Sequence, residues 1–167
     1  MRRKLYRFFA EDHRRLESLL KKATASAEGY DMKAYAEFRA GLLKHIKMEE
    51  HVLLPAAQKA RGGKPLDIAE RIRLDHGALT ALMVPPPSPA IIGALRAILE
   101  VHDELEEKSG GMYETLEELT EGQMDELLTK VKSVGDVPVH PHNDKPFVLD
   151  ATRRALARAG YNLDDHA

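Results

Sequence analysis

Hydrophobic residues recur along most of the chain at alternating steps of three and four, which is the spacing of one face of an α-helix. Four long segments carry this pattern, and glycine or proline residues separate them. The expected helices are residues 3–27, 32–60, 65–83 and 89 to at least 108. Strand patterns are nearly absent. We therefore expect an all-α fold in which short turns join four helices into an antiparallel up-down four-helix bundle.

Local signals place the ends of these helices. Asp31 is the expected N-cap of the second helix, and Pro65 suits the first position of the third. Ser88 and Pro89 are the expected cap and first residue of the fourth. Pro55 lies inside the second helix, where its missing N–H predicts a kink one turn past Glu49.

The C-terminal part of the chain has a weaker pattern. Residues 109–111, Ser-Gly-Gly, are expected to bend or break the fourth helix before the helical pattern resumes at Met112–Leu119. Short helices are expected at 123–134 and 151–159, with an extended segment between them. We expect residues 1–119 to form the bundle and residues 120–167 to form a helical extension. This extension either packs on the bundle or pairs two copies of the chain into a homodimer.

Polar residues interrupt the apolar face of each long helix. They occupy positions where core hydrophobes are expected: His13, His45, Glu49, His76, His102 and Glu106. Burying imidazoles and carboxylates is costly unless they are paired or bind a metal ion. A structural His–Glu ion pair is the alternative explanation for each half of the chain. Because two such pairs in one small core would be expensive to desolvate, a metal centre is favoured.

These residues also form a repeat. Asp12-His13-x-x-Leu16 matches Asp75-His76-x-x-Leu79, and each is followed on the next helix by His-x-x-(Met/Leu)-Glu-Glu, at 45–50 and 102–107. A pseudo-two-fold axis through the bundle would bring these half-sites face to face. Four imidazoles and two carboxylates suffice for two metal ions with bridging carboxylates. The pattern leaves open whether Asp12 and Asp75 support the ligands or face solvent.

The repeat resembles the hemerythrin-like family, the His-His-Glu cation-binding domains, over about residues 5–119. The resemblance implies a four-helix bundle around a non-haem di-iron centre, with His13, His45, Glu49, His76, His102 and Glu106 as metal ligands. Oxygen-carrying members have a second His on the third helix, where this chain has Ile72 or Thr80. The Lys-Ser-Gly-Gly run at 108–111 also departs from the family pattern.

Composition narrows the chemistry. The chain has no Cys, so thiolate metal sites are excluded, and a mixed imidazole and carboxylate set suits iron, manganese or zinc. The net charge of −2 argues against nucleic acid or an anionic membrane as the main partner. No stretch reaches the roughly 20 apolar residues of a membrane span. A cytoplasmic location is therefore expected.

The expected function is binding of dioxygen or a related small ligand at two iron ions, for oxygen or iron binding, sensing or storage. Two alternatives stay open: a di-iron oxidase or peroxidase, and a zinc-stabilised interaction module in which residues 120–167 engage a partner. His51 lies off the ligand face and is expected at the surface. His140 and His142 form only a weak candidate metal site, because Pro141 separates them and no carboxylate is near on a shared element.

Overall fold

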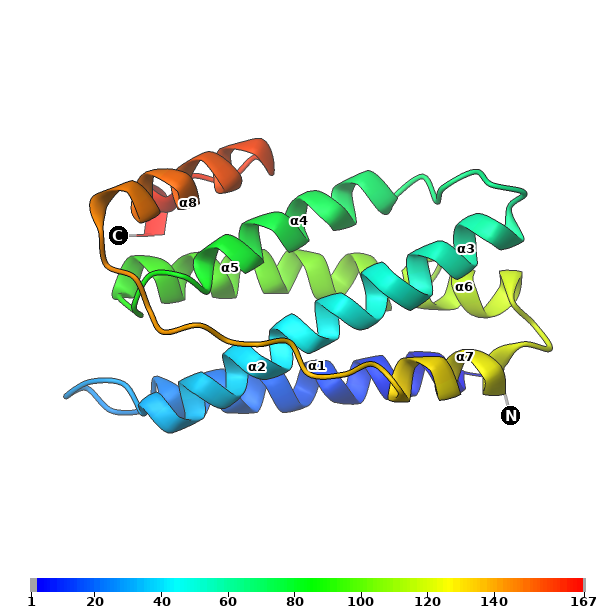
Figure 1. Ribbon diagram of the computed structural model, residues 1–167, viewed down its shortest axis with the longest axis horizontal. Coiled ribbons are helices and arrows are strands. Elements are labelled where there is room, and N and C mark those ends of the chain that lie inside the picture. Colours follow the sequence, from blue (N-terminus) through cyan, green and yellow to red (C-terminus); the bar gives the residue numbers. More distant parts are fainter. Residues whose placement is uncertain (1–2, 167) are drawn as a thin grey trace. The chain divides into compact units, whose positions relative to one another are not determined.

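The computed structural model describes residues 3–166, and all regular secondary structure in that range is helical (Figure 1). This confirms the all-α expectation. The described chain divides into two compact units, each made of two separate stretches. The first unit comprises the residues up to Asp67 together with Leu105–Val139, and the second comprises Ile68–Glu104 together with the residues from His140. The antiparallel four-helix arrangement stays a prediction.

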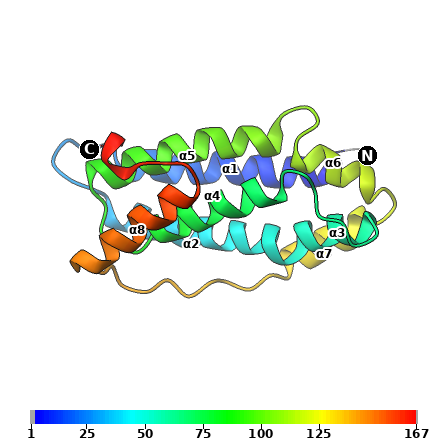
Figure 2. The ribbon, with the colours of Figure 1, turned by 90° about the horizontal axis from the view of Figure 1, so that it is seen from above.

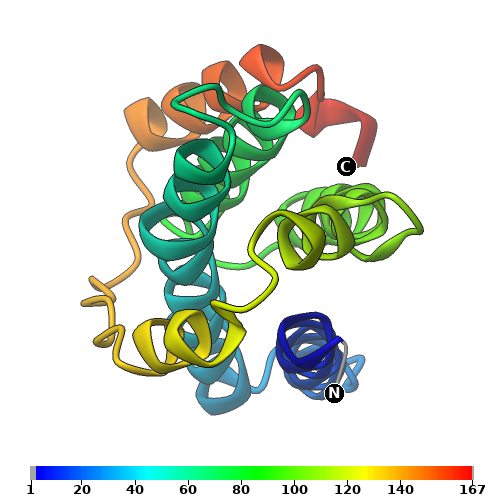
Figure 3. The ribbon, with the colours of Figure 1, turned by 90° about the vertical axis from the view of Figure 1, so that its right-hand side faces the viewer.

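The first unit is organised around a helical hairpin. It contains α1 (Lys4–Ala23), α2 (Met32–Met48), η1 (Glu49–Leu53), α3 (Leu54–Ala60), α6 (Met112–Leu119) and α7 (Met124–Lys132). The helix α1 packs along α2, while α6 packs against α1 and α3. The helix α7 covers η1 and part of α1 (Figure 3). The apolar face of α1, with Leu5, Phe9, Leu16 and Leu20, is buried as the periodicity predicts.

The second unit contains α4 (Ala69–Leu82), α5 (Pro89–Glu107), α8 (Pro146–Arg158) and the 3-10 helix η2 (Leu163–His166). Residues 105–107, the last turn of α5, group with the first unit. The helix α8 packs along α4, so this part of the C-terminal extension covers a helix of the expected bundle (Figure 2). No helix within residues 3–166 has the length and apolar character needed to cross a membrane.

Capping residues begin two helices where the sequence indicates. The Asp31 carboxylate accepts hydrogen bonds from the backbone N–H groups of Lys33 and Ala34, at 3.1 and 3.0 Å. Ser88 accepts one from the N–H of Ile91 at 3.3 Å. The chain also breaks at the expected glycines, since α5 ends at Glu107 and α6 begins at Met112.

Three predicted boundaries are wrong. The first helix ends at Ala23 rather than residue 27. The third begins at Ala69 rather than Pro65, whose carbonyl accepts a hydrogen bond from the Arg61 guanidinium in the preceding loop. The last helix begins at Pro146 rather than 151, because the extended backbone of Lys145 lets this proline take the first helical turn.

The second long helix contains a π-helical turn, η1, directly after α2. The backbone N–H of Leu54 donates to the carbonyl of Glu49, five residues earlier, and Pro55 then begins the next turn without an N–H of its own. The extra residue shifts the apolar face. Leu53 and Ala57 are buried there, whereas Val52 and Ala56, where α-helical spacing from Leu42, His45 and Glu49 would continue the apolar face, are partly exposed.

Candidate metal centre

Four of the expected ligands converge inside the first unit. His13 lies on α1, His45 on α2, Glu49 at the start of η1 and Glu106 in the last turn of α5. One donor atom from each lies within 4.8 Å of the others, and none of the four side chains is more than 4% exposed. The Nε2 atom of His13 is 3.0 Å from that of His45 and 3.2 Å from Glu106 Oε2. The Nε2 atom of His45 is 3.2 Å from Glu49 Oε1.

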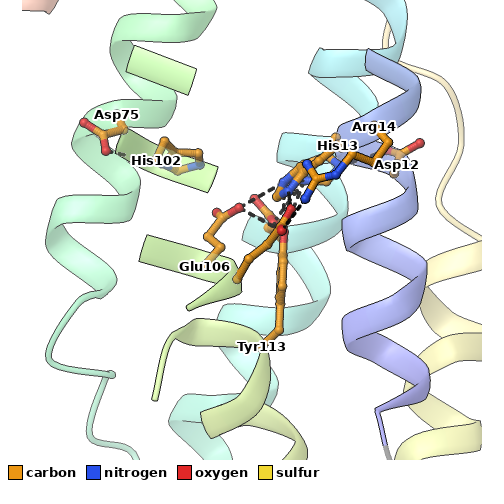
Figure 4. A network of polar contacts seen from close by, with 10 residues as sticks. Asp12, His13, Arg14, Asp75, His102, Glu106 and Tyr113 are labelled. Atoms are coloured by element: carbon orange, nitrogen blue, oxygen red, sulfur yellow. Dashed lines mark hydrogen bonds and ion pairs between the residues drawn. The ribbon is translucent and has the colours of Figure 1, made fainter. Parts of the chain in front are cut away.

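A carboxylate contacts the Nδ1 atom of each of the two imidazole rings, His13 and His45. His13 Nδ1 is 2.6 Å from Glu107 Oε1, and Arg14 binds the second oxygen of the same carboxylate (Figure 4). His45 Nδ1 is 2.8 Å from Asp12 Oδ2, and Arg15 binds Asp12 in turn. Because an ionised carboxylate only accepts hydrogen bonds, each Nδ1 carries a proton and each Nε2 is directed at the cluster. This is the orientation that a metal-binding histidine needs.

The second unit repeats this arrangement around His102. Its Nδ1 atom is 3.3 Å from Asp75 Oδ2, so Asp75 contacts His102 through the same ring atom by which Asp12 contacts His45. The rings of His76 and His102 meet edge to face with centroids 4.8 Å apart, and both side chains are buried. Arg71 and the Tyr161 hydroxyl also bind the Asp75 carboxylate. The open question about the two aspartates is thereby answered, because each contacts a predicted ligand.

The buried charges shift the pKa values of these groups. Burial alone would lower the pKa of His45, but the carboxylates of Glu49, Asp12 and Glu106 outweigh it and raise that pKa to about 10. Burial opposes ionisation of Asp12 as well, yet His45 and Arg15 lower its pKa below the ordinary value. The pKa of Asp75 is lowered in the same way, against its burial, by His102 and Arg71.

One residue of the cluster was missed by reasoning from the sequence. The Tyr113 hydroxyl, from α6, donates to Glu49 Oε1 at 2.6 Å and lies 2.9 Å from Glu106 Oε2 (Figure 4). It is also 3.2 Å from His13 Nε2 and 3.4 Å from His45 Nε2. Burial and the charges of Glu106 and Glu49 raise the pKa of this phenol well above its usual value. Periodicity gave no signal for Tyr113, because α5 ends at Glu107 and α6 begins at Met112, so the helical spacing from Glu106 does not continue to it.

The remaining histidines lie elsewhere. His51 is exposed, as expected. His140 is exposed and His142 is partly exposed, on the segment 134–145, which has no helix. Within residues 3–166, neither joins a group of three or more side chains that could share a metal ion. The weak candidate site at His140 and His142 therefore gains no support.

The donor set of the first unit fits a metal ion. Two imidazole nitrogens and two carboxylate oxygens are ligands for iron, manganese or zinc, and the two carboxylates offset the charge of one divalent ion. A buried His/Glu cluster of this kind can bind a metal ion. In comparisons with protein-family models, characterised proteins and solved structures, no match to this chain was found.

Proposed function

We propose that this chain is a non-haem iron protein of hemerythrin type, which binds dioxygen or a related small ligand at a di-iron centre. The observation that carries the proposal is the buried convergence of His13, His45, Glu49 and Glu106 in the first unit. Two imidazoles turned toward two carboxylates, with aspartate and glutamate behind them, support metal binding better than a structural ion pair.

The proposal of a second iron ion rests on the sequence repeat. His76 and His102 occupy the second half-site in the same order as His13 and His45, and their rings are adjacent in the second unit. Asp12 contacts His45 and Asp75 contacts His102 in the same way, which adds to the parallel between the two half-sites.

Iron held by histidine and carboxylate supplies an electron-rich centre with coordination positions left for a small ligand, since six protein donors do not saturate two ions. The buried residue four positions before His76 is Ile72, and the residue four positions after it, Thr80, is exposed. Neither Ile72 nor an exposed Thr80 replaces the additional histidine of oxygen-carrying members. This favours a second candidate function, a di-iron oxidase or peroxidase that uses the vacant position.

The test begins with elemental analysis of protein purified without added metal, followed by optical spectra under air and under vacuum. We expect about two iron ions per chain and absorption bands that depend on oxygen and reverse under vacuum. Many turnovers of hydrogen peroxide would instead support the oxidase or peroxidase. Tightly bound zinc without oxygen-dependent bands would support the zinc-stabilised interaction module. A chain that retains no metal refutes the proposal.

A further inference from the structure

The hydroxyl oxygen of Tyr113 lies among the four donor atoms of the first unit. Its distances to one atom each of Glu49, Glu106, His13 and His45 are 2.6, 2.9, 3.2 and 3.4 Å. Two ligand atoms bound to one ion at about 2.0–2.2 Å stand roughly 2.8 to 3.6 Å apart in tetrahedral or octahedral geometry. The Tyr113 oxygen is therefore spaced from the other four donors approximately as a fifth ligand atom would be.

Packing keeps the phenol in this place. The Tyr113 side chain is fully buried, and its ring stacks on Phe9 with centroids 5.1 Å apart. Phe9 also meets the His45 ring edge to face, at 5.2 Å. Tyr6 contacts the Tyr113 ring from another side, at 6.3 Å. A side chain confined by two aromatic contacts does not leave the cluster without disturbing the core around it.

The break between α5 and α6 allows the Tyr113 side chain, on α6, to reach the cluster. At Gly110 the backbone has a φ of 73°, which favours glycine. At Gly111 a Cβ atom would lie 2.7 Å from the carbonyl oxygens of Leu105 and Lys108. These glycines belong to the run 108–111, where the sequence departs from the family pattern. The run that differs from the family pattern thus comes directly before the helix that carries the additional donor, Tyr113.

We propose that Tyr113 is a fifth protein ligand of the metal ion bound by His13, His45, Glu49 and Glu106. When the ion binds, the phenol O–H bond breaks, its electron pair forms the oxygen–metal bond and the proton passes to solvent. The oxidation state of the metal does not change in this step. An anionic oxygen donor adds negative charge, so it favours ferric over ferrous iron, and tyrosine is an established type of protein ligand to iron.

This inference rests on the proposed function, because it requires iron at the first-unit cluster. The test uses the full chain loaded with ferrous iron and then oxidised in air. We expect a visible phenolate-to-iron charge-transfer band, and resonance Raman modes that shift when the protein carries ring-deuterated tyrosine. In Tyr113→Phe the band and these modes should disappear while at least one iron ion remains bound.

Tyr35→Phe is the matched control. Tyr35 is another fully buried tyrosine of the first unit, on α2, and it stacks on Phe38 rather than on a predicted ligand. The band should persist in this variant. Bound ferric iron without tyrosine-dependent Raman modes in the unsubstituted protein overturns the inference and leaves the proposed function standing. Failure to bind iron refutes both. Because the absence of these Raman modes is detected without any variant, it overturns the inference even if Tyr113→Phe does not fold.

Discussion

Asp12 contacts the Nδ1 atom of His45 at 2.8 Å, although the two residues lie 33 positions apart and on different helices. Asp12 immediately precedes another predicted ligand, His13, in the sequence. One helical turn of α1 therefore presents an imidazole to the cluster and also orients the imidazole of the next helix. Asp75 makes the corresponding contact with His102 at 3.3 Å. The aspartate of the Asp-His-x-x-Leu repeat is thus a positioning residue for the neighbouring helix.

Replacing Asp12 by Asn should weaken metal binding by about 10- to 100-fold, because the amide no longer fixes the charge and orientation of His45. Competition with a chelator of known affinity measures the change. Asp136→Asn is the control, since Asp136 forms an exposed ion pair with Lys44. Equal affinities for the two variants would contradict a positioning role for Asp12.

Replacing His45 by Ala should reduce bound metal to one ion or none, because the cluster then loses an imidazole that is only 2% exposed. His51→Ala is the control. His51 lies in η1, directly after α2, and its side chain is exposed, so this variant should keep its metal. Elemental analysis of both proteins, purified side by side, makes the comparison. Full metal content in His45→Ala would remove this residue from the ligand set.

The stability of the metal-free chain should fall at high pH. The folded-state pKa of His45 is raised from 6.5 to about 10, so its contribution to the free energy of unfolding is complete below pH 6.5 and is lost as pH rises through about 10. Denaturant unfolding at several pH values should show this loss for the unsubstituted chain but not for His45→Gln. Parallel pH profiles for the two proteins would mean that His45 is not charged in the folded metal-free state.

Metal binding near neutral pH should release protons, because His45 binds an ion only as a neutral imidazole at Nε2. Its pKa of about 10 means that the ring carries an extra proton in the metal-free chain at that pH. Calorimetric titrations in buffers of different ionisation enthalpy measure the number released. Each proton released makes the apparent affinity rise about tenfold per pH unit. A binding enthalpy independent of the buffer would exclude this coupling.

Gly111 and Gly77 should respond in opposite directions to substitution by Ala. A Cβ atom at Gly111 would lie 2.7 Å from two backbone oxygens, so Gly111→Ala should destabilise the chain by roughly 1–3 kcal/mol. A Cβ atom at Gly77, in α4, meets nothing within 4 Å, and Gly77→Ala should stabilise by up to about 1 kcal/mol. Denaturant midpoints measure both effects. A harmless Gly111→Ala would show that the α5–α6 break tolerates a side chain.

The hydrophobic pattern predicted the helices and the buried polar positions because both depend on the helical period alone. His13, His45 and Glu106 are buried where the apolar face continues through them. Helix ends depend on loop contacts instead. The third helix was predicted to begin at Pro65, but a hydrogen bond from Arg61 to the Pro65 carbonyl holds that residue in the loop.

Tyr113 and the apolar face after Glu49 could not be placed by periodicity, because each follows an interruption of the α-helical register. A break precedes Tyr113, and a π turn follows Glu49. Each interruption changes the direction of the side chains that come after it by an amount the residue spacing does not encode. Both lie next to a predicted carboxylate ligand, which agrees with the tendency of such irregular turns to occur at functional sites.

The π turn at Glu49–Leu53 makes the length of this helix as important as its composition. Deleting one residue there would restore an unbroken α-helix and keep Leu53 and Ala57 in the interior, because they would take positions 52 and 56, where α-helical spacing places the core face. Deleting a second residue would rotate everything after it by about 100° and turn both side chains away from the interior. The extra residue of the π turn thus lets the helix lose one residue at this point without moving the ligands before it or the hydrophobic contacts after it.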